Sequence, residues 1–335
     1  MTASEDIGQM AIELSNRTAL PALLFRTVVD DTRMAAAIVA RVTYEVGAGG
    51  HLSRAEAQPW RVSPVPWDGP AGPMPSDDAF YRGGVDLFVF GDAWTSGGRP
   101  AVASEVRVQV GERLQATIAV YGDRVWTGRP GRLKISPPAP FVCMPLTLGR
   151  AYGGRASWDG LQVASPENPY GRGLCLSEEQ AAGTPLSNLE DPTCPVRRWS
   201  DTPDPVGTAL CPRWFGPRVR AGTTFDQHGQ LIALRGRLFN DAFPALVAPA
   251  VEPGDAIQVD GVTPDGPVRF IVPPSPLLAE LAIGATRVEA PLRIDQIGIE
   301  PPLRRVFITY RYPFRYVVTA RQRRTCALRE LARRK

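Results

Sequence analysis

Histidine, closely spaced cysteine and long apolar runs are all scarce in this sequence, and each scarcity excludes a class of protein. Among 335 residues there are two histidines, His51 and His228, and both stand in turn-like surroundings. A metal site needs several histidine, cysteine or carboxylate ligands at compatible spacing. The five cysteines lack the spacing of a redox or zinc motif, which favours a reduced chain. The sequence therefore predicts neither a metal nor another cofactor.

Apolar runs are too short for a membrane protein. The best of them, residues 34–40, stops at Arg41, whereas a spanning helix needs about 20 apolar residues. Residues 1–10 lack the basic region and the apolar stretch of a signal peptide. We therefore expect a cytoplasmic protein that does not cross a membrane. The chain contains 34 prolines and 32 glycines, which interrupt helices, so we do not expect long helices.

What is present is a hydrophobic period of two, which is the period of a β-strand. In residues 38–46 alternate positions are apolar, and Arg41, Thr43 and Glu45 fall on the opposite face, which predicts a strand buried on one face only. Further strands are predicted at residues 85–90, 287–294 and 304–311, and hairpins at 105–121 and 256–272. We therefore predict an all-β fold of mainly antiparallel strands in packed sheets.

The middle of the chain, residues 127–220, shows no sustained hydrophobic period. It is dense in proline, glycine and asparagine, which are residues of turns and loops. It also holds many aromatic side chains, whereas disordered linkers are poor in them. We therefore expect long irregular loops that are ordered and packed on the sheets.

Basic residues gather at the end of the chain. Residues 304–335 carry 11 basic side chains and one acid, whereas residues 1–303 have a net charge of −6. A short helix is expected over residues 320–335, where Ala327, Leu328 and Leu331 form an apolar stripe. We divide the chain into one β-rich domain over 12–319 and a basic tail over 320–335. The tail is either a solvated end or an electrostatic anchor for an acidic partner surface.

Motifs that carry catalytic chemistry are not found in the sequence. No Gly-x-Ser-x-Gly elbow occurs, and the glycine-rich stretches lack the helix and the Lys-Ser/Thr pair of a phosphate loop. Acidic pairs such as Glu190-Asp191 are adjacent in the chain, whereas glycosidase carboxylates come from separate segments. We therefore expect a protein that is not an enzyme.

Sparse and unusual loop motifs recur along the chain. The most specific is Tyr121-Gly122-Asp123-Arg124-Val125-Trp126, and the others, with two short matches in predicted strands at 42–44 and 110–111, lie at residues 16–18, 56–59, 91–94, 97–100, 140–146, 150–154, 168–173, 186–192, 221–226, 239–242 and 261–266. In their order and number these motifs resemble the domain-of-unknown-function (DUF) family 2169, over roughly residues 12–319. A typical member has glutamate where this chain has Gly149, so no role of that glutamate is carried over.

Members of that family are regarded as adaptors or chaperones of bacterial type VI secretion. The resemblance implies a cytoplasmic protein of a Gram-negative bacterium. It would bind a secreted effector, often one with a PAAR-like tip domain, and help load it onto the trimeric spike protein of the secretion machine. The resemblance carries over no catalytic residues. The function expected from it is a non-enzymatic effector adaptor.

Arginine and aromatic residues of the loops are the expected partner-binding residues. Arg, Trp and Tyr are enriched at binding hot spots, and loops carried on a rigid sheet commonly bind partners. The expected residues are Arg124, Trp126, Arg150, Tyr152, Arg172 and Trp214. The alternative is that they support the loops themselves, with Arg124 paired to Asp123. Trp126 is expected to be such a support, because it closely follows a predicted strand.

Two other functions compete with the adaptor. A carbohydrate-binding or hydrolytic β-protein would bind sugar with its aromatic loops, and as an enzyme it would need two convergent carboxylates in the cleft. A nucleic-acid binder would use the basic tail. The net charge of −6 over residues 1–303 argues against a continuous basic surface and hence against nucleic acid as a partner.

Overall fold

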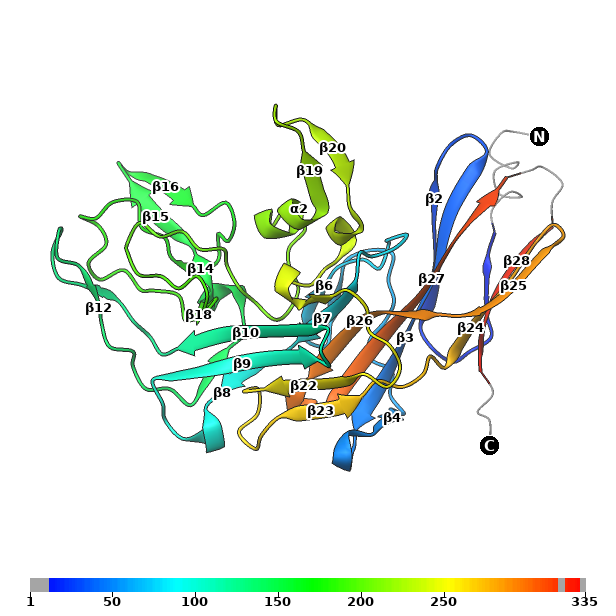
Figure 1. Cartoon of the computed structure of the whole chain (residues 1–335), viewed down its shortest axis with the longest axis horizontal. Coiled ribbons are helices and arrows are strands. Elements are labelled where there is room, and N and C mark those ends of the chain that lie inside the picture. Colours follow the sequence, from blue (N-terminus) through cyan, green and yellow to red (C-terminus); the bar gives the residue numbers. More distant parts are fainter. Residues whose placement is uncertain (1–11, 319–322, 332–335) are drawn as a thin grey trace.

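Seven strands form a central sheet in the order β2-β3-β27-β26-β7-β21, with β4 also paired to β3. The computed structural model describes residues 12–318 and 323–331. β3 and β27 pair antiparallel over their length, whereas β26 and β7 run parallel. Figure 1 shows this sheet crossing the middle of the molecule. Its strands are β2 Ala22–Val28, β3 Arg33–Val46, β4 Leu52–Arg54, β7 Val85–Val89, β21 Val247–Ala248, β26 Arg293–Glu300 and β27 Arg305–Val317.

β3 differs from the prediction in that both of its faces are buried. Arg41 and Thr43, which the hydrophobic period assigns to an open face, are 1% and 0% exposed. The Arg41 guanidinium donates to Thr309 Oγ1 (2.8 Å) and pairs with Asp77 (2.6 Å). The half-buried strand was therefore a wrong prediction. A segment distant in the chain covers the polar face and supplies the partners that buried polar groups need.

A second sheet of five strands shares the core of the central sheet. It contains both hairpins that the sequence predicts, β9–β10 and β22–β23. Val108 and Val259 from this sheet and Ile38 and Phe307 from the central sheet belong to one hydrophobic core. The predicted all-β fold of packed, mainly antiparallel sheets is thus confirmed. In sheet order the strands are β18 Leu189–Glu190, β10 Leu114–Tyr121, β9 Ala103–Val110, β22 Ala256–Asp260 and β23 Val268–Ile271.

A third sheet contains the described part of the tail, and the helix predicted there is wrong. Residues Arg324–Glu330 form strand β28, which lies parallel to β1 and antiparallel to β24. Cys326 and Leu328 are buried in the main core, and Arg329 forms ion pairs with Glu280 and Glu289. The sheet supplies hydrogen bonds and apolar cover that a short isolated helix lacks. The other strands are β1 Leu14–Asn16, β24 Leu277–Ile283 and β25 Thr286–Pro291.

Two predicted strands have different bounds in the structure. The strand expected at 287–294 is divided, because β25 ends at Pro291 in the third sheet and β26 begins at Arg293 in the central sheet. The strand expected at 304–311 continues to Val317 through Pro313. Pairing with β26 stops at Arg311, so Pro313 lies where β27 has a partner on one side only, a position that proline tolerates.

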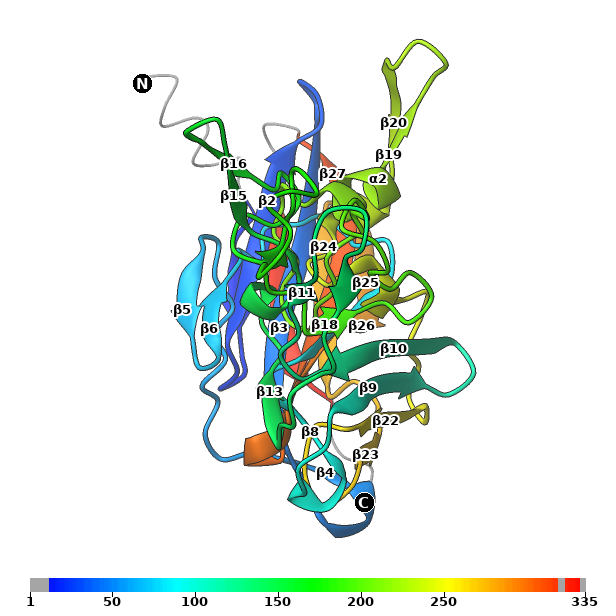
Figure 2. The same ribbon diagram turned by 90° about the vertical axis from the view of Figure 1, so that its left-hand side faces the viewer.

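The middle of the chain, residues 127–220, consists of ordered loops, as expected, and of short two-stranded ribbons, which were not predicted. They lie at the left and top of Figure 1, and the turned view in Figure 2 shows them stacked in front of the sheets. The helix α2, Gly216–Gly222, was not predicted. No helix in the described ranges has the length and apolarity to span a bilayer. Within and outside this region, the two-stranded ribbons of the described residues are β5 Trp67–Gly69 with β6 Gly72–Met74, β8 Asp92–Trp94 with β13 Cys143–Pro145, β11 Trp126–Thr127 with β12 Lys134–Ile135, β14 Tyr152–Gly153 with β17 Arg172–Gly173, β15 Arg155–Trp158 with β16 Leu161–Ala164, and β19 Thr223–Phe225 with β20 Leu231–Leu234. Short 3-10 turns are η1 Ala48–Gly50, η2 Ser96–Gly98, η3 Leu148–Arg150, η4 Gly236–Phe239, η5 Pro244–Leu246 and η6 Pro301–Leu303.

Candidate functional site

Arg124 is buried in the loops and holds two segments together. Its Nη2 atom donates to Glu190 Oε1 (2.6 Å) and to Ser187 O (2.7 Å), and its guanidinium lies 4.1 Å from the centre of the Tyr121 ring. The expected pair between Arg124 and Asp123 is therefore wrong. Glu190 is the partner because β18 pairs with β10 and brings this carboxylate inward. Arg124 is 7% exposed, so it supports the loops from inside.

Trp126 and Tyr152 are also buried, in a small second core with Leu186 and Val196. The Tyr152 hydroxyl is buried and has no hydrogen-bond partner among the described residues. Burial raises the pKa of Tyr152 from 10.0 to about 12. The structure thus places both aromatic side chains inside the loops, where each contacts neighbouring loop residues.

Arg150 and Arg172 meet at one carboxylate on the surface. Asp123 Oδ1 accepts from Arg150 Nη1 (3.2 Å), Arg172 Nη1 (3.3 Å) and Asn188 Nδ2 (3.1 Å). We call these four residues the Asp123 cluster. The arginine side chains are 29% and 27% exposed. Burial and the neighbouring Arg150 lower the pKa of Arg172, whereas Asp123 opposes them. Two guanidiniums share one carboxylate, so the cluster keeps a net positive charge that suits an acidic partner group.

Asn168 positions the two arginines of the Asp123 cluster. It is fully buried, and its Nδ2 atom donates to Leu148 O (2.8 Å) and Tyr152 O (3.0 Å). The loop that follows Asn168 leads into β17, which pairs in parallel with β14. Gly153 has a φ of +132°, and a Cβ atom there would lie 2.3 Å from Asn168 O. The close backbone approach that only glycine allows thus brings Arg172 beside Arg150.

Trp214 lies apart from the other five predicted residues. It precedes Phe215, which packs edge-on against Phe243 at 5.2 Å in a third small core. The Trp214 side chain itself is 49% exposed. The structure therefore brings five of the predicted residues into one loop region and places Trp214 at the start of α2.

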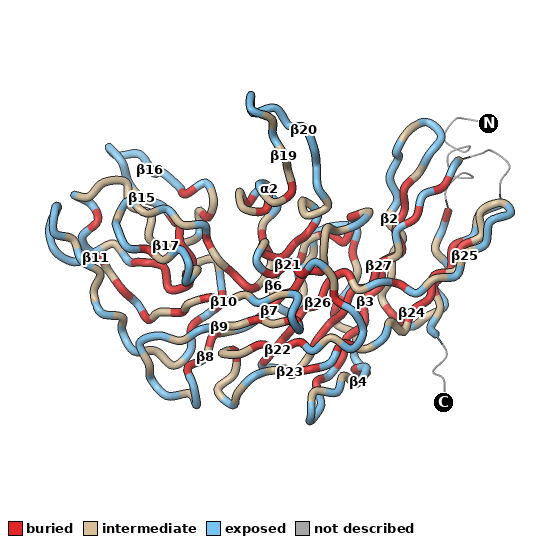
Figure 3. Tube along the Cα trace, viewed as in Figure 1, coloured by how far each residue is buried: buried red, intermediate tan, exposed pale blue. Residues whose placement is uncertain are grey.

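Exposed apolar residues on two projecting hairpins were missed by the sequence reasoning. The ribbons β15–β16 and β19–β20 both rise from the top of the molecule, in the two perpendicular views of Figures 1 and 2. Figure 3 shows their outer parts as exposed. The signal that could have found β20 is its run of four apolar residues without a polar alternate. The exposed apolar residues are Trp158, Leu161 and Val163 on one hairpin and Phe225, Leu231, Ile232 and Leu234 on the other.

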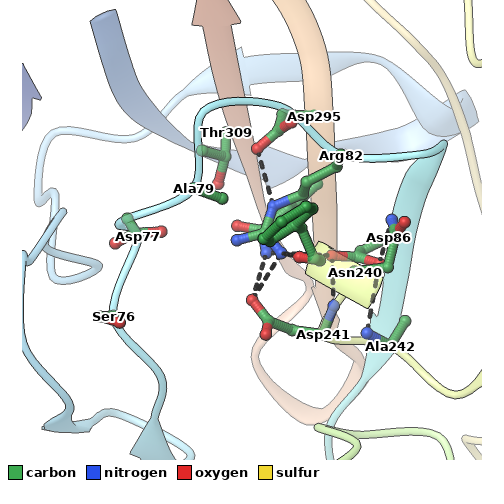
Figure 4. A network of polar contacts seen from close by, with 12 residues as sticks. Ser76, Asp77, Ala79, Arg82, Asp86, Asn240, Asp241, Ala242, Asp295 and Thr309 are labelled. Atoms are coloured by element: carbon green, nitrogen blue, oxygen red, sulfur yellow. Dashed lines mark hydrogen bonds and ion pairs between the residues drawn. The ribbon is translucent and has the colours of Figure 1, made fainter. Parts of the chain in front are cut away.

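A buried ion network in the central sheet was also missed. Arg82 pairs with Asp241 (2.7 Å), Asp295 (3.1 Å) and Asp86 (3.3 Å), and its side chain is 2% exposed. Figure 4 shows these three carboxylates arriving from different segments around the guanidinium. Arg311 adds a second bond to Asp295 at 2.9 Å. Residues 82 and 241 belong to loops, so the network fixes those loops on strands β7, β26 and β27.

Asp86 is the most enclosed member of this ion network. Its carboxylate accepts from Asn240 Nδ2 (2.9 Å) and from the backbone N–H groups of Asp241 (2.9 Å) and Ala242 (3.2 Å). Burial raises the pKa of Asp86, and the Arg82 guanidinium opposes that shift. The motif at residues 239–242, singled out in the sequence, thus serves to fill the hydrogen bonds of a buried charge. Because the carboxylates here are held by cations and N–H groups, the network is suited to stabilising the fold rather than to proton transfer.

A surface cavity of about 580 Å³ lies at the end of the five-stranded sheet. Its lining includes Trp94 and Arg99, which belong to two of the loop motifs, and Glu105 of β9 and Asp260 of β22. Glu105 forms an ion pair with Arg107, and Asp260 accepts from Gln258 Nε2 at 2.7 Å and 2.9 Å. No group of three or more metal-ligating side chains occurs within residues 12–318 and 323–331.

The structure is that of an all-β protein with buried, paired charges at its centre and hairpins that expose apolar side chains. Residues 31–311 match the family model described as an uncharacterized protein conserved in bacteria (DUF2169). This match covers more than half of the chain, and the protein belongs to that family. Searches among curated proteins and among solved structures found no match.

Proposed function

We propose that the protein is a non-enzymatic adaptor that binds a secreted effector and helps load it onto the spike of a type VI secretion machine. The observation that carries the proposal is the exposed apolar side chains on hairpins β15–β16 and β19–β20. Exposed apolar groups that cluster on a soluble surface mark interaction sites. The family resemblance supplies the kind of partner.

The projecting hairpins and the Asp123 cluster are suited to complementary parts of one interface. The hairpins offer apolar area, and the partly exposed Arg150 and Arg172 offer charge at the rim. Stable interfaces bury about 1,200–2,000 Å² in total, which is a surface rather than a pocket. The paired strands β14 and β17 and the buried Asn168 hold Arg150 and Arg172 in place, so this charged part of the surface is preorganised before a partner arrives. The proposed adaptor acts in the cytoplasm of a Gram-negative bacterium and catalyses no reaction.

Affinity capture in the bacterium that encodes the protein tests this function. The tagged chain is expressed in place of its own gene, and bound proteins are identified by mass spectrometry. We expect one secreted effector and the spike protein to be enriched, and secretion of that effector to require the adaptor. A variant with both Phe225 and Ile232 replaced by Ser should lose the effector, whereas Arg129→Ala, an exposed change that belongs to neither hairpin, should retain it. The proposal fails if no secretion component is enriched with the wild-type chain.

A carbohydrate-binding protein is the second candidate, and the cavity beside Trp94 favours it. Trp94 lines the same cavity as the carboxylates of Glu105 and Asp260, and a pyranose ring stacks well on an exposed indole face. Both carboxylates already have polar partners, which weighs against hydrolysis. Calorimetric titration with a panel of oligosaccharides tests this candidate. Binding that disappears in Trp94→Ala would support it, and the absence of heat from all of them would reject it.

A further inference from the structure

The strand β20 exposes apolar side chains on both of its faces. Leu231, Ile232 and Leu234 are 52%, 61% and 56% exposed, and Phe225 on the partner strand is 52% exposed. In an ordinary surface hairpin one face packs on the core and the other is polar. An isolated two-stranded hairpin is at best marginally stable in water. The β19–β20 hairpin therefore has the composition of a strand that is covered on both sides.

Some backbone groups of β20 point away from β19, and the hydrogen bonds between the two strands show which ones. The Arg235 N–H donates to Gly222 O (2.8 Å), and the Asp226 N–H donates to Gln230 O (2.9 Å). Hydrogen-bonded and non-hydrogen-bonded pairs alternate along an antiparallel ladder. The neighbouring pairs, Leu234 with Thr223 and Leu231 with Phe225, are therefore of the non-bonded kind. It follows that the N–H and C=O groups of Leu231 and Leu234 face outward, and β19–β20 has no third strand within the described chain.

The surface next to this edge indicates what would cover it. Beyond β20 the chain passes Arg235 and Arg237 and reaches Phe239, whose exposed ring lies 5.9 Å from that of Tyr81. Neither arginine forms an ion pair with a carboxylate in the described residues. The Arg235 Nε atom donates to the neutral Thr224 Oγ1 (3.0 Å), so its charge is not neutralised. An extended segment paired with β20 would thus meet apolar side chains first and, at its end, two arginines without a carboxylate partner. Its matching sequence alternates apolar residues and ends in an acidic one.

We propose that the outer edge of β20 takes up an extended strand from another protein, which completes a three-stranded sheet. That the strand belongs to the secreted effector rests on the function proposed above; the mode of docking does not. A second copy of this chain fits the edge poorly. Residues 231–239 contain no acid, so β20 of a second copy would leave Arg235 and Arg237 unpaired.

Selection of phage-displayed random peptides on the purified wild-type chain tests the docking mode. Peptides of roughly ten residues, the length of a long strand, are suitable probes. We expect the selected peptides to alternate apolar residues and to carry an acid near one end. Fluorescence anisotropy then measures their affinity for Leu234→Pro, which lacks the outward N–H, and for Leu234→Thr, which keeps it. Leu234→Pro should weaken binding about tenfold or more, and Leu234→Thr clearly less.

Amide hydrogen exchange supplies a measurement that needs no variant. Bound peptide should slow exchange at Leu231 and Leu234 and leave the Arg235 amide, already bonded to Gly222, almost unchanged. Peptides that bind Leu234→Pro as well as wild type and do not slow these amides would overturn the proposal, as would a selection that yields no binder. Self-association in sedimentation experiments that Leu234→Pro abolishes would replace the foreign strand by a second copy. If peptides dock on β20 but affinity capture enriches no secretion component, the adaptor role alone is refuted. If the effector is captured equally well by Leu234→Pro, strand docking alone is refuted.

Discussion

The centre of the molecule and its projecting hairpins reverse the usual distribution of polarity. Around Arg82 the central sheet buries charged side chains, among them Asp86, Asp241 and Asp295. The hairpin β19–β20 does the opposite and exposes Ile232 and Leu234 to solvent. Within the centre every one of these charges has a partner, so the fold accounts for it. Nothing in the described chain covers the hairpin side chains, so the fold alone does not account for them.

This difference separates residues that the fold needs from residues that a partner would need. Buried paired charges lose much stability when one member is removed, because the others are left uncompensated. Exposed apolar side chains on a hairpin contribute little to folding, and changing them should alter binding instead. The variants below are therefore arranged by their expected effect on the free energy of unfolding.

Arg82→Met should produce the largest loss of stability. It removes the cation shared by three buried carboxylates, and breaking a buried pair in this way costs about 3–5 kcal/mol. The loss should be smaller at low pH, because the pKa of Asp86 is raised already and rises further without Arg82, so the protonated side chain needs no cation. Chemical unfolding at several pH values measures this. Arg220→Met, which breaks exposed pairs, should cost about 0–1 kcal/mol and serves as control.

Replacement of two tryptophans by alanine should sharpen the comparison within the loops. Trp126 is 3% exposed, so Trp126→Ala should cost about 3–5 kcal/mol of unfolding free energy. Trp214 is 49% exposed, and Trp214→Ala should change stability by only about 0.5 kcal/mol. Urea unfolding of the two variants provides the test. Equal losses would mean that the buried loop core contributes no more to stability than the surface.

Tyr152→Phe should stabilise the protein by about 1 kcal/mol near neutral pH, because it removes a buried hydroxyl without a hydrogen-bond partner. The sign of the pH effect is also fixed. The folded-state pKa of Tyr152 is raised from 10.0 to about 12, so the unfolded chain loses its proton first, and stability falls as pH rises between these values. Tyr152→Phe should show a smaller alkaline loss than wild type in thermal unfolding. A loss of stability at neutral pH would indicate that the hydroxyl has a partner after all.

Ile232→Thr should have the smallest effect on folding. The side chain is 61% exposed, so the unfolding free energy should change by about 0.5 kcal/mol or less. Threonine is also a good strand residue, so the hairpin itself should persist. Differential scanning calorimetry compares this variant with the wild type. A marked loss of stability would place Ile232 in a packing role and weaken the contrast between centre and hairpin.

Sequence patterns correctly predicted those strands that pair with a neighbouring segment of the chain. The hairpins β9–β10 and β22–β23 were found because alternating side chains and turn residues lie together in the chain. The partners of the loop residues were not predicted: if Arg124 supported the loops it was expected to pair with the neighbouring Asp123, whereas it pairs with Glu190, 66 residues away. Such a partner cannot be read from spacing, because the strand pairing that brings it close is itself a long-range contact. The four consecutive apolar residues of β20 can be seen in the sequence, but they show no alternation of polar and apolar positions and so did not predict a strand.

The sequence by itself determined the β-class of the fold, the ordered loops and the family resemblance, since these depend on residue types and on their order. Only the tertiary structure decided that Arg41 is buried and that Arg324–Glu330 is a strand. It also decided that Arg82 has three carboxylate partners. In each case the deciding atoms come from segments far along the chain: Asp77 for Arg41, strands β1 and β24 for the tail, and residues 241 and 295 for Arg82. A polar side chain is buried or exposed according to the partners that reach it, and those partners are specified by the packing of the whole chain.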